Sequence, residues 1–377
     1  MSSIVPAGPA TARNLTGVAA DLIGSLTGAP AGLPAARSAV LFVVDGLGAI
    51  PLRAHGGHAR FLTGAMGKRD VARTAFPSTT AAALTSLLTG AWPGEHGLVG
   101  YRVRDPERGV LANQLNGYER DGLDPDTWQR SRTVFERAAE RGLPSFAVSL
   151  ASYAGTGLTR AILRGAAFVG ERELRARVEA AVALAERHAG AIVYCYLPEL
   201  DQAGHRDGMA SDRWVTTLEA IDAALQAAQR LPSGVGAIVT SDHGMVDVPR
   251  HRHVLLREDD PRLDGVAQLG GEPRLLHVYA EPGRDASALA DTWRSASQGT
   301  ADVATRDEAI AAGLFGPAVD DAVRGRIGDV LVAARGLWAF YDDRLDDRKP
   351  QDMVGQHGSV TAEEVTVPFI RLGAFAS

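Results

Sequence analysis

The sequence of 377 residues contains a single cysteine, Cys195. An internal disulfide needs two cysteines and a thiolate metal cluster needs several, so the sequence excludes both. Cys195 lies within the apolar run 191–196. We therefore expect a buried, unreactive thiol there.

Long apolar runs and an excess of positive charge are also lacking. No run reaches the roughly 18 apolar residues that a membrane span requires, and Asp21 interrupts the one stretch that resembles a signal peptide. We expect a soluble cytoplasmic protein with no membrane partner. Lysine occurs only at Lys68 and Lys349, and the net charge is −6. This balance disfavours long nucleic acid as the main ligand.

Short apolar runs that end in Gly or Asp clusters alternate with helical patterns along the chain. The runs indicate buried strands of a mostly parallel sheet, at residues 39–44, 145–150, 191–197 and 235–240. The helical patterns include residues 79–88, 133–140, 171–188 and 212–231. Such alternation predicts an α/β fold, with a mostly parallel central sheet flanked by helices.

The same patterns divide the chain into segments. We expect an N-terminal extension at residues 1–35, a catalytic core at 36–255 and 328–377, and a smaller α+β insertion at 256–327. The insertion is indicated by a strand at 274–280 and a helix at 285–297, and residues 328–333 would return the chain to the core. Residues 102–129 are polar and loop-like, and would overhang the site.

Asp201 and His205 are the first candidate metal ligands. Their four-residue spacing places both side chains on one face of a helical turn. A carboxylate and an imidazole so placed can hold one divalent cation. Taken alone, the pair could equally be a solvated helix start.

Further candidate ligands follow predicted strands, where α/β sheets bind their ligands. Asp45 follows the first strand, Asp242 and His243 follow the strand 237–240, and His357 lies between glutamine and glycine. Asp45 alone could be an ordinary turn residue. Together, however, three aspartates and three histidines would converge on one sheet edge. Burying so many carboxylates is costly unless cations neutralise them, and two divalent cations would do so.

A segment of small residues supplies a candidate nucleophile. Residues 75–90 read as a loop that opens a helix, and the first turn of that helix carries Ser78, Thr79 and Thr80. Helix N-terminal amides favour a bound anion, and a hydroxyl beside a metal becomes a nucleophile. Without metals, simple capping of the helix would explain these hydroxyls.

Five short motifs, in order, span nearly the whole chain. They are Asp45 after the first strand, the Thr80-to-Gly90 segment with Pro93-x-x-His96-Gly97, Asp201-x-x-x-His205, Ser241-Asp242-His243-Gly244-Met245, and Gly355-x-His357-Gly358. In this ordered set the chain resembles the alkaline phosphatase superfamily, in its type I phosphodiesterase/nucleotide pyrophosphatase branch.

The resemblance implies an alkaline-phosphatase-like core with two divalent cations, Zn²⁺ or Mn²⁺, and assigns the ligands. One cation would be held by Asp201, His205 and His357, and the other by Asp45, Asp242 and His243. Thr80, ten residues before Gly90 in the family register, would be the nucleophile and a ligand of the second cation. His96 is similar to a structural histidine of the family.

One position departs from the family pattern. Family phosphodiesterases often carry an asparagine three residues after the nucleophile, where this chain has Ala83. A backbone amide, or a residue of the overhanging segment, would then bind the phosphoryl oxygen. The candidates are Asn113, Asn116 and Arg102, together with Gln114 and Arg104.

The resemblance implies a hydrolase of nucleotide-type phosphoric diesters that acts through a phospho-threonine. The chain is also similar to actinobacterial enzymes of this type that cleave cyclic dinucleotides such as cyclic di-AMP. No arginine neighbours Thr80, which favours a diester over a doubly charged monoester. The alternatives are a phosphomonoesterase or phosphonate hydrolase on the same core, and a non-catalytic metal- or nucleotide-binding relic. A sulfatase is excluded, because Cys195 lacks the neighbouring residues of a sulfatase nucleophile. We expect the protein to be a monomer or a weak dimer.

Overall fold

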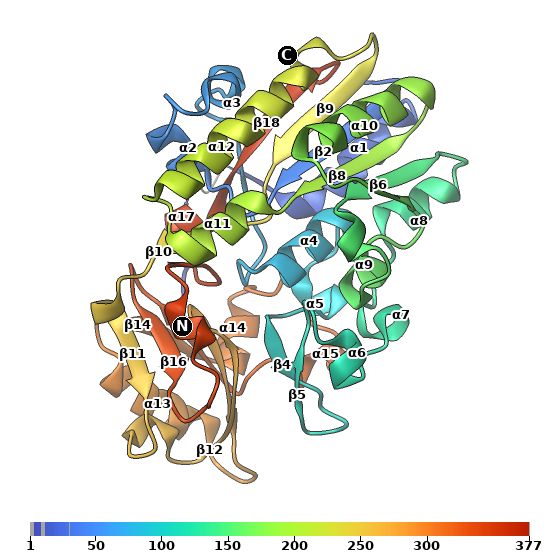
Figure 1. Cartoon of the computed structure of the whole chain (residues 1–377). Coiled ribbons are helices and arrows are strands. Elements are labelled where there is room, and N and C mark those ends of the chain that lie inside the picture. Colours follow the sequence, from blue (N-terminus) through green and yellow to red (C-terminus); the bar gives the residue numbers. More distant parts are fainter. Residues whose placement is uncertain (1–3, 9–11, 30, 377) are drawn as a thin grey trace.

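The computed structural model describes residues 4–8, 12–29 and 31–376. They form a larger lobe around an eight-stranded sheet and a smaller lobe that contains a four-stranded sheet, and Figure 1 shows the two lobes one above the other. Within these residues, no helix is long and apolar enough to cross a bilayer.

The larger sheet is mostly parallel, which confirms the fold class predicted from the alternating strands and helices. In spatial order its strands are β1 (Arg13–Asn14), β3 (Val71–Arg73), β18 (Thr366–Gly373), β9 (Val235–Thr240), β2 (Ser38–Val44), β8 (Ile192–Leu197), β6 (Ser145–Ser149) and β7 (Ala167–Gly170). Only β18 runs against its neighbours, pairing antiparallel with both β3 and β9.

Both faces of this sheet are covered, so its strands are apolar without a polar face. In β2, Leu41 and Val43 belong to one buried cluster, whereas Phe42 and Val44 belong to the other. The first cluster is completed by α1 (Val18–Leu26), α4 (Thr80–Thr89), α8 (Val134–Ala139) and α9 (Gly157–Ile162). The second is completed by α2 (Ala49–Ala54), α3 (Arg60–Ala65), α10 (Leu174–Arg187) and α12 (Asp212–Leu225).

The N-terminal segment is part of this core rather than the extension expected for residues 1–35. Its strand β1 extends the sheet edge beside β3, and its helix α1 buries Val18, Ala19 and Leu22 in the first cluster. The segment around this helix is rich in Ala, Gly, Pro, Ser and Thr, and this composition obscures the helical spacing of its larger apolar residues. Residues 1–3, 9–11 and 30 of this range lie outside the described structure.

The smaller lobe is built on an antiparallel sheet. In spatial order its strands are β12 (Val266–Glu272), β13 (Leu275–Ala280), β15 (Val330–Ala334) and β14 (Ala301–Thr305). Three helices accompany them: α13 (Ala286–Ala296), α14 (Arg306–Ala311) and α15 (Asp321–Arg324). Another pair of strands, β11 (His253–Leu256) and β16 (Ala339–Asp342), is parallel.

The return to the core, expected at residue 328, is wrong because β15 belongs to the smaller sheet. It pairs with β13 on one side and β14 on the other. Leu331 and Ala333 pack into the first cluster of the larger lobe, and Val330 and Val332 pack against α13. This interior strand is buried on both faces, and its sequence therefore resembles a core strand of the larger sheet.

Residues 102–129 contain more regular structure than the loop expected there. A hairpin joins β4 (Arg102–Arg104) to β5 (Leu111–Asn113), and the short helices α6 (Tyr118–Asp121) and α7 (Pro125–Trp128) follow. These elements are too short for hydrophobic periodicity to reveal them.

Candidate active site

Three parallel strands of the larger sheet deliver acidic and histidine residues to one edge. Asp45 follows β2, and Asp242 and His243 follow β9. After β8 the chain enters α11 (Glu199–Asp207), whose first turn carries Asp201 and whose last turn carries His205. The carboxyl ends of neighbouring parallel strands meet at one edge, which is where such sheets bind ligands.

His357 and Thr80 reach the same edge from other elements. His357 follows β17 (Gly355–Gln356), which is tied to β10 (Val246–Asp247) just beyond His243. Thr80 is the first residue of α4, and Thr79 before it has an extended backbone. The helix ends at Gly90, whose φ of +71° is the left-handed conformation that glycine adopts without strain.

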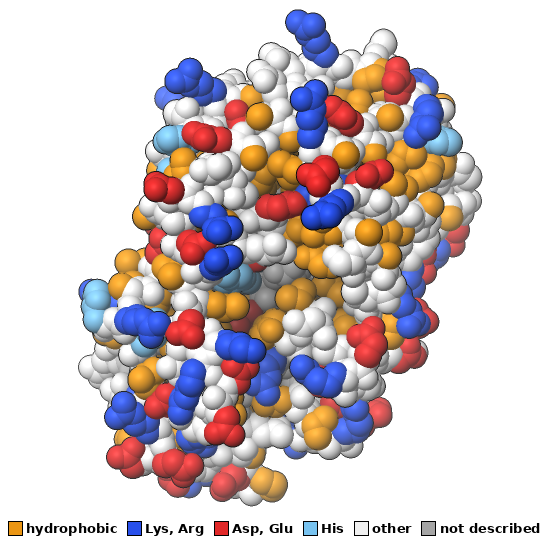
Figure 2. All heavy atoms as spheres, in the orientation of Figure 1, with side chains coloured by type: hydrophobic (Ala, Val, Ile, Leu, Met, Phe, Trp, Pro, Cys, Tyr) orange, Lys and Arg blue, Asp and Glu red, His pale blue; other side chains and the backbone are white. Residues whose placement is uncertain are grey.

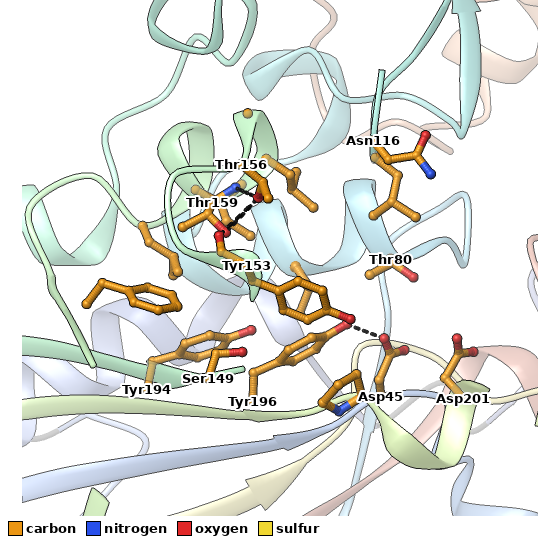
Figure 3. Close-up of a pocket in the computed structure, with 18 of the residues that line it drawn as sticks. Asp45, Thr80, Asn116, Ser149, Tyr153, Thr156, Thr159, Tyr194, Tyr196 and Asp201 are labelled. Carbon is orange, nitrogen blue, oxygen red and sulfur yellow. Dashed lines mark hydrogen bonds between the residues drawn. The ribbon is translucent and has the colours of Figure 1, made fainter. Parts of the chain in front are cut away.

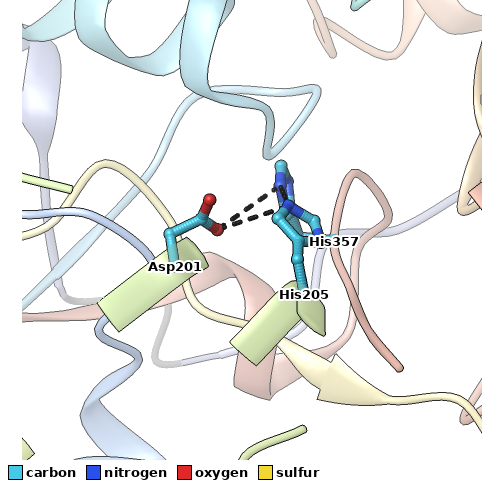
Figure 4. Close-up of side chains that lie close together, drawn as sticks. All are labelled: Asp201, His205 and His357. Atoms are coloured by element: carbon cyan, nitrogen blue, oxygen red, sulfur yellow. Dashed lines mark hydrogen bonds and ion pairs between the residues drawn. The ribbon is translucent and has the colours of Figure 1, made fainter. Parts of the chain in front are cut away.

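The structure brings the six candidate ligands together in two groups of three. One group is Asp201, His205 and His357, and the other is Asp45, Asp242 and His243. In each group, one ligand atom from every residue lies within 4.8 Å of the others. Figure 4 shows the carboxylate of Asp201 facing both imidazoles of its group.

The histidines are oriented as metal ligands are. Nδ1 of His205 lies 2.8 Å from the carbonyl oxygen of Gly355, and Nδ1 of His357 lies 2.9 Å from that of Ser78. Each Nδ1–H therefore donates to a carbonyl, which leaves Nε2 unprotonated and aimed at the site. The two Nε2 atoms lie 3.2 Å apart. Two lone pairs at this distance repel unless a cation lies against them.

The carboxylates also fit bound cations. Asp45 Oδ1, Asp201 Oδ1 and Asp242 Oδ2 are buried without a hydrogen-bond partner among the described residues. Burial raises the pKa of Asp45 well above its usual range, and the neighbouring carboxylates of Asp242 and Asp201 raise it further. Unpaired buried carboxylates are costly, and divalent cations remove that cost. The donor set of oxygen and imidazole nitrogen suits Zn²⁺ or Mn²⁺.

Thr80 lies directly against the second group. Its Oγ1 is 3.0 Å from Nε2 of His243, and that nitrogen is 3.4 Å from Oδ1 of Asp45. Since Thr80 begins α4, the positive end of the helix dipole also lies at this hydroxyl. A hydroxyl so placed can attack an anionic phosphoryl group.

Two cavities meet at Thr80, and both are lined by Leu115, Asn116 and Asp201. The first, which we call the tyrosine cavity, is about 380 Å³ and includes the rings of Tyr153, Tyr194 and Tyr196 (Figure 3). The second, the junction cavity, is about 360 Å³ and lies between the lobes, lined by residues that include His205, Glu272, Tyr341 and His357. The surface is hollowed near this junction (Figure 2).

The expected substrate-binding residues are placed differently from one another. Asn116 lines both cavities, and Arg102 lines the junction cavity. Asn113 Oδ1 instead accepts hydrogen bonds from the backbone amides of Leu115 and Asn116. Gln114 is likewise occupied, because its Oε1 accepts from the amides of Val99 and Gly100. Arg104 donates its backbone amide to the hydroxyl of Tyr279.

Several residues that line the site, among them the tyrosines of the tyrosine cavity and Glu272, were not predicted from the sequence. The hydroxyl of Tyr196 donates to Oδ2 of Asp45 (Figure 3), and Glu272 lines the junction cavity from the smaller lobe. Tyr194 and Tyr196 alternate along β8, so both rings face the side of the sheet that holds the tyrosine cavity. The two-residue spacing of these tyrosines along a predicted strand could have indicated a shared face, whereas no sequence pattern pointed to Glu272.

Comparisons with known proteins identify the family of the chain. The family described as type I phosphodiesterase/nucleotide pyrophosphatase matches residues 39–360. No curated protein sequence matches the chain.

Solved structures share the fold. A murine ectonucleotide pyrophosphatase/phosphodiesterase 5 is 17% identical with a TM-score of 0.67, over 89% of this chain and 88% of its own. An inactive threonine-to-alanine variant of that mouse protein, solved with AMP, is also 17% identical with a TM-score of 0.67, over 90% of this chain and 88% of its own. Phosphonoacetate hydrolase from Sinorhizobium meliloti 1021, solved with phosphonoacetate, is 20% identical with a TM-score of 0.70, over 91% and 94%. With its two candidate metal-binding groups and its matching family, the chain belongs to the type I phosphodiesterase/nucleotide pyrophosphatase hydrolases.

Proposed function

We propose that this protein hydrolyses phosphoric diesters that carry a nucleotide-type group, with Thr80 as the covalent nucleophile. The observation that carries the proposal is the position of Thr80. Its hydroxyl lies 3.0 Å from Nε2 of His243, at the start of α4, where two cavities meet. The threonine-to-alanine variant of the mouse phosphodiesterase, described as inactive, supports the same role for a threonine.

The chain's own residues then perform two displacements at phosphorus. Asp45, Asp242 and His243 would hold one divalent cation, and Asp201, His205 and His357 the other. When bound, Zn²⁺ or Mn²⁺ supplies the positive charge that favours the Thr80 alkoxide and neutralises the developing negative charge. Oγ1 of Thr80 forms a bond to phosphorus, and the leaving oxygen departs with its electron pair and takes up a proton. Water then cleaves the phospho-threonine, which releases a monoester and restores the Thr80 hydroxyl.

The tyrosine cavity supports a nucleotide-type substrate. Rings of Tyr153, Tyr194 and Tyr196 line it beside Thr80, and aromatic side chains stack on nucleobases whatever the base. The junction cavity, on the other side of Thr80, offers room for a second substituent. A diester with two large groups, such as a cyclic dinucleotide like cyclic di-AMP, would use both. A nucleotide of this kind fits the cytoplasmic location that we propose.

A phosphonate hydrolase is the second candidate. The Sinorhizobium meliloti phosphonoacetate hydrolase, solved with phosphonoacetate and with phosphonoformate, has the same fold. The apolar and aromatic walls of the tyrosine cavity favour the nucleotide-type diester, because a small and highly charged phosphonate would leave them without a ligand.

The proposed function is tested with the protein reconstituted in Zn²⁺ or Mn²⁺. A chromogenic phosphodiester, cyclic di-AMP and phosphonoacetate are each supplied to the wild type and to Thr80→Ala, with Thr85→Ala on the same helix as the matched control. We expect diester turnover in the wild type and control, and its loss in Thr80→Ala. Wild-type rates in Thr80→Ala would contradict the covalent scheme, and turnover of phosphonoacetate alone would select the second candidate.

A further inference from the structure

Glu272 places an acidic side chain in the junction cavity from the smaller lobe. It is the last residue of β12 and lines the cavity together with Thr79, Thr80 and His357. Its side chain is buried, with 7% of the residue exposed. A buried carboxyl at the mouth of a phosphate site is unusual, because both the substrate and the carboxyl are acidic.

The backbone around Glu272 is built to hold it there. A Cβ added to Gly358 would lie 2.6 Å from Cγ of Glu272, and Gly358 has a φ of +126°. Gly271, with a φ of +82°, also excludes a side chain, because its Cβ would lie 2.0 Å from the carbonyl oxygen of Leu275. Only glycine at these two positions lets Glu272 lie against the loop that carries His357.

No arginine or lysine pairs with this carboxyl among the described residues. Oε1 of Glu272 is buried without a hydrogen-bond partner. The guanidinium of Arg274, two residues on, is instead paired with Glu364 at 3.0 Å and 2.7 Å. The pKa of Glu272 is raised to about 8, because burial and the nearby Glu364 raise it more than a hydrogen bond with Thr79 lowers it.

We propose that Glu272 is a specificity-determining residue, which selects a singly charged phosphodiester over a doubly charged phosphomonoester. The inference rests on the proposed function. A monoester brings a second anionic oxygen that needs added positive charge. In the same cavity it meets the Glu272 carboxyl, which no arginine or lysine of the described residues neutralises. Once that carboxyl is ionised, the two like charges disfavour the monoester. In a diester the corresponding oxygen is esterified and uncharged, so the carboxylate of Glu272 does not repel it.

Other charged groups share the cavity and stay unchanged in the test. Arg102 reaches it from β4, and the remaining titratable groups there and beside Glu272 are Tyr101, Asp201, His205, Tyr341, Asp342, Asp347, His357 and Glu364. The diester-to-monoester ratio of kcat/KM cancels ionisations that affect both substrates equally, such as those of the metal ligands and Thr80. The ratio therefore isolates discrimination from catalysis.

The experiment compares bis(4-nitrophenyl) phosphate with 4-nitrophenyl phosphate, which share one leaving group. At about pH 9, where Glu272 is ionised, we expect Glu272→Gln to lower the diester-to-monoester ratio about tenfold or more, mainly by raising kcat/KM for the monoester. Glu281→Gln removes an exposed carboxylate of the same lobe, outside the cavity, and should leave the ratio unchanged. In the wild type the ratio should rise from about pH 7 to about pH 9 as Glu272 ionises, and in Glu272→Gln it should stay flat.

The outcomes separate the role of Glu272 from the proposed function. An unchanged ratio in folded Glu272→Gln would overturn the inference while the proposed function stands. If that variant does not fold, the wild-type pH profile decides, and a flat ratio overturns the inference. A wild type with no diester turnover would contradict the proposed function itself.

Discussion

Nε2 of His243 lies 3.0 Å from the hydroxyl of Thr80 and 3.4 Å from carboxylate oxygens of both Asp45 and Asp242. One imidazole nitrogen thus contacts the candidate nucleophile and both acidic members of its group. The nucleophile and the metal ligands form one cluster, so a change to any ligand should alter the charge around Thr80.

Cation binding to this cluster should stabilise the folded protein. Because Asp45, Asp201 and Asp242 bury unpaired oxygens close together, we expect chelator to lower Tm. Zn²⁺ or Mn²⁺ at a hundred times Kd should restore about 2.7 kcal/mol. Differential scanning calorimetry measures both changes.

Asp45→Asn serves as the matched variant. It removes one of the repelling carboxylates, so the chelated variant should be more stable than the chelated wild type, and its response to metal should shrink. A chelated Asp45→Asn that is less stable than chelated wild type would contradict the predicted repulsion.

Tyr196 should act on metal affinity through Asp45. Its hydroxyl donates to Oδ2 of Asp45, and outer hydrogen bonds to metal ligands orient them. We expect Tyr196→Phe to weaken metal binding by about 10- to 100-fold, as measured by isothermal titration calorimetry. Tyr194→Phe, which alters the neighbouring ring of the same cavity, should not change it. Equal losses in both variants would instead indicate a general disturbance of the cavity.

The buried ion pair between Arg274 and Glu364 should hold the His357 loop to the smaller lobe. Both side chains are fully buried, and Oε1 of Glu364 also accepts from the amide of Ser359. Arg274→Met leaves a buried charge without a partner and should cost about 3–5 kcal/mol of unfolding free energy. The double variant with Glu364→Leu should recover part of this loss in urea unfolding. A single variant within 1 kcal/mol of wild type would contradict the prediction.

His96 should remain neutral in the folded protein well below its usual pKa. Leu98 donates its amide to Nδ1, and Nε2–H donates to the hydroxyl of Ser86. Burial, with a smaller contribution from the charge of Arg326, lowers the pKa of His96 from 6.5 to about 3. Between these values the unfolded chain binds a proton that the folded chain does not, so His96 reduces stability as pH falls through this window.

NMR measures this directly. The His96 imidazole nitrogens, assigned by their absence in His96→Gln, should keep the neutral pattern from about pH 8 to about pH 5. Protonation within that range would show that the imidazole reaches solvent.

Several strands of the larger sheet and the metal-ligand candidates at their ends could be predicted from the sequence, because each has a strong local pattern. Apolar runs that end in Asp or Gly located β2, β8 and β9, and with them the positions of Asp45, Asp201 and Asp242, since parallel strands deliver their ends to one edge. Weaker signals failed for physical reasons. Strand β15 is apolar because both lobes pack against it, and α1 lies in a segment rich in Ala, Gly, Pro, Ser and Thr, which obscures its apolar spacing. Glu272 reaches the site only through tertiary packing against Gly358, which spacing along the chain does not reveal.

The placement of β18 has a consequence for biosynthesis. Every other strand precedes β18 along the chain, yet β18 lies inside the larger sheet, and it alone joins β1 and β3 to β9 (Figure 1). Until β18 has emerged from the ribosome, the sheet therefore remains in two parts with exposed pairing edges. Such late, long-range pairing is slow and leaves nascent chains open to aggregation. Expression yield should consequently depend on chaperone supply, even when the finished fold is stable.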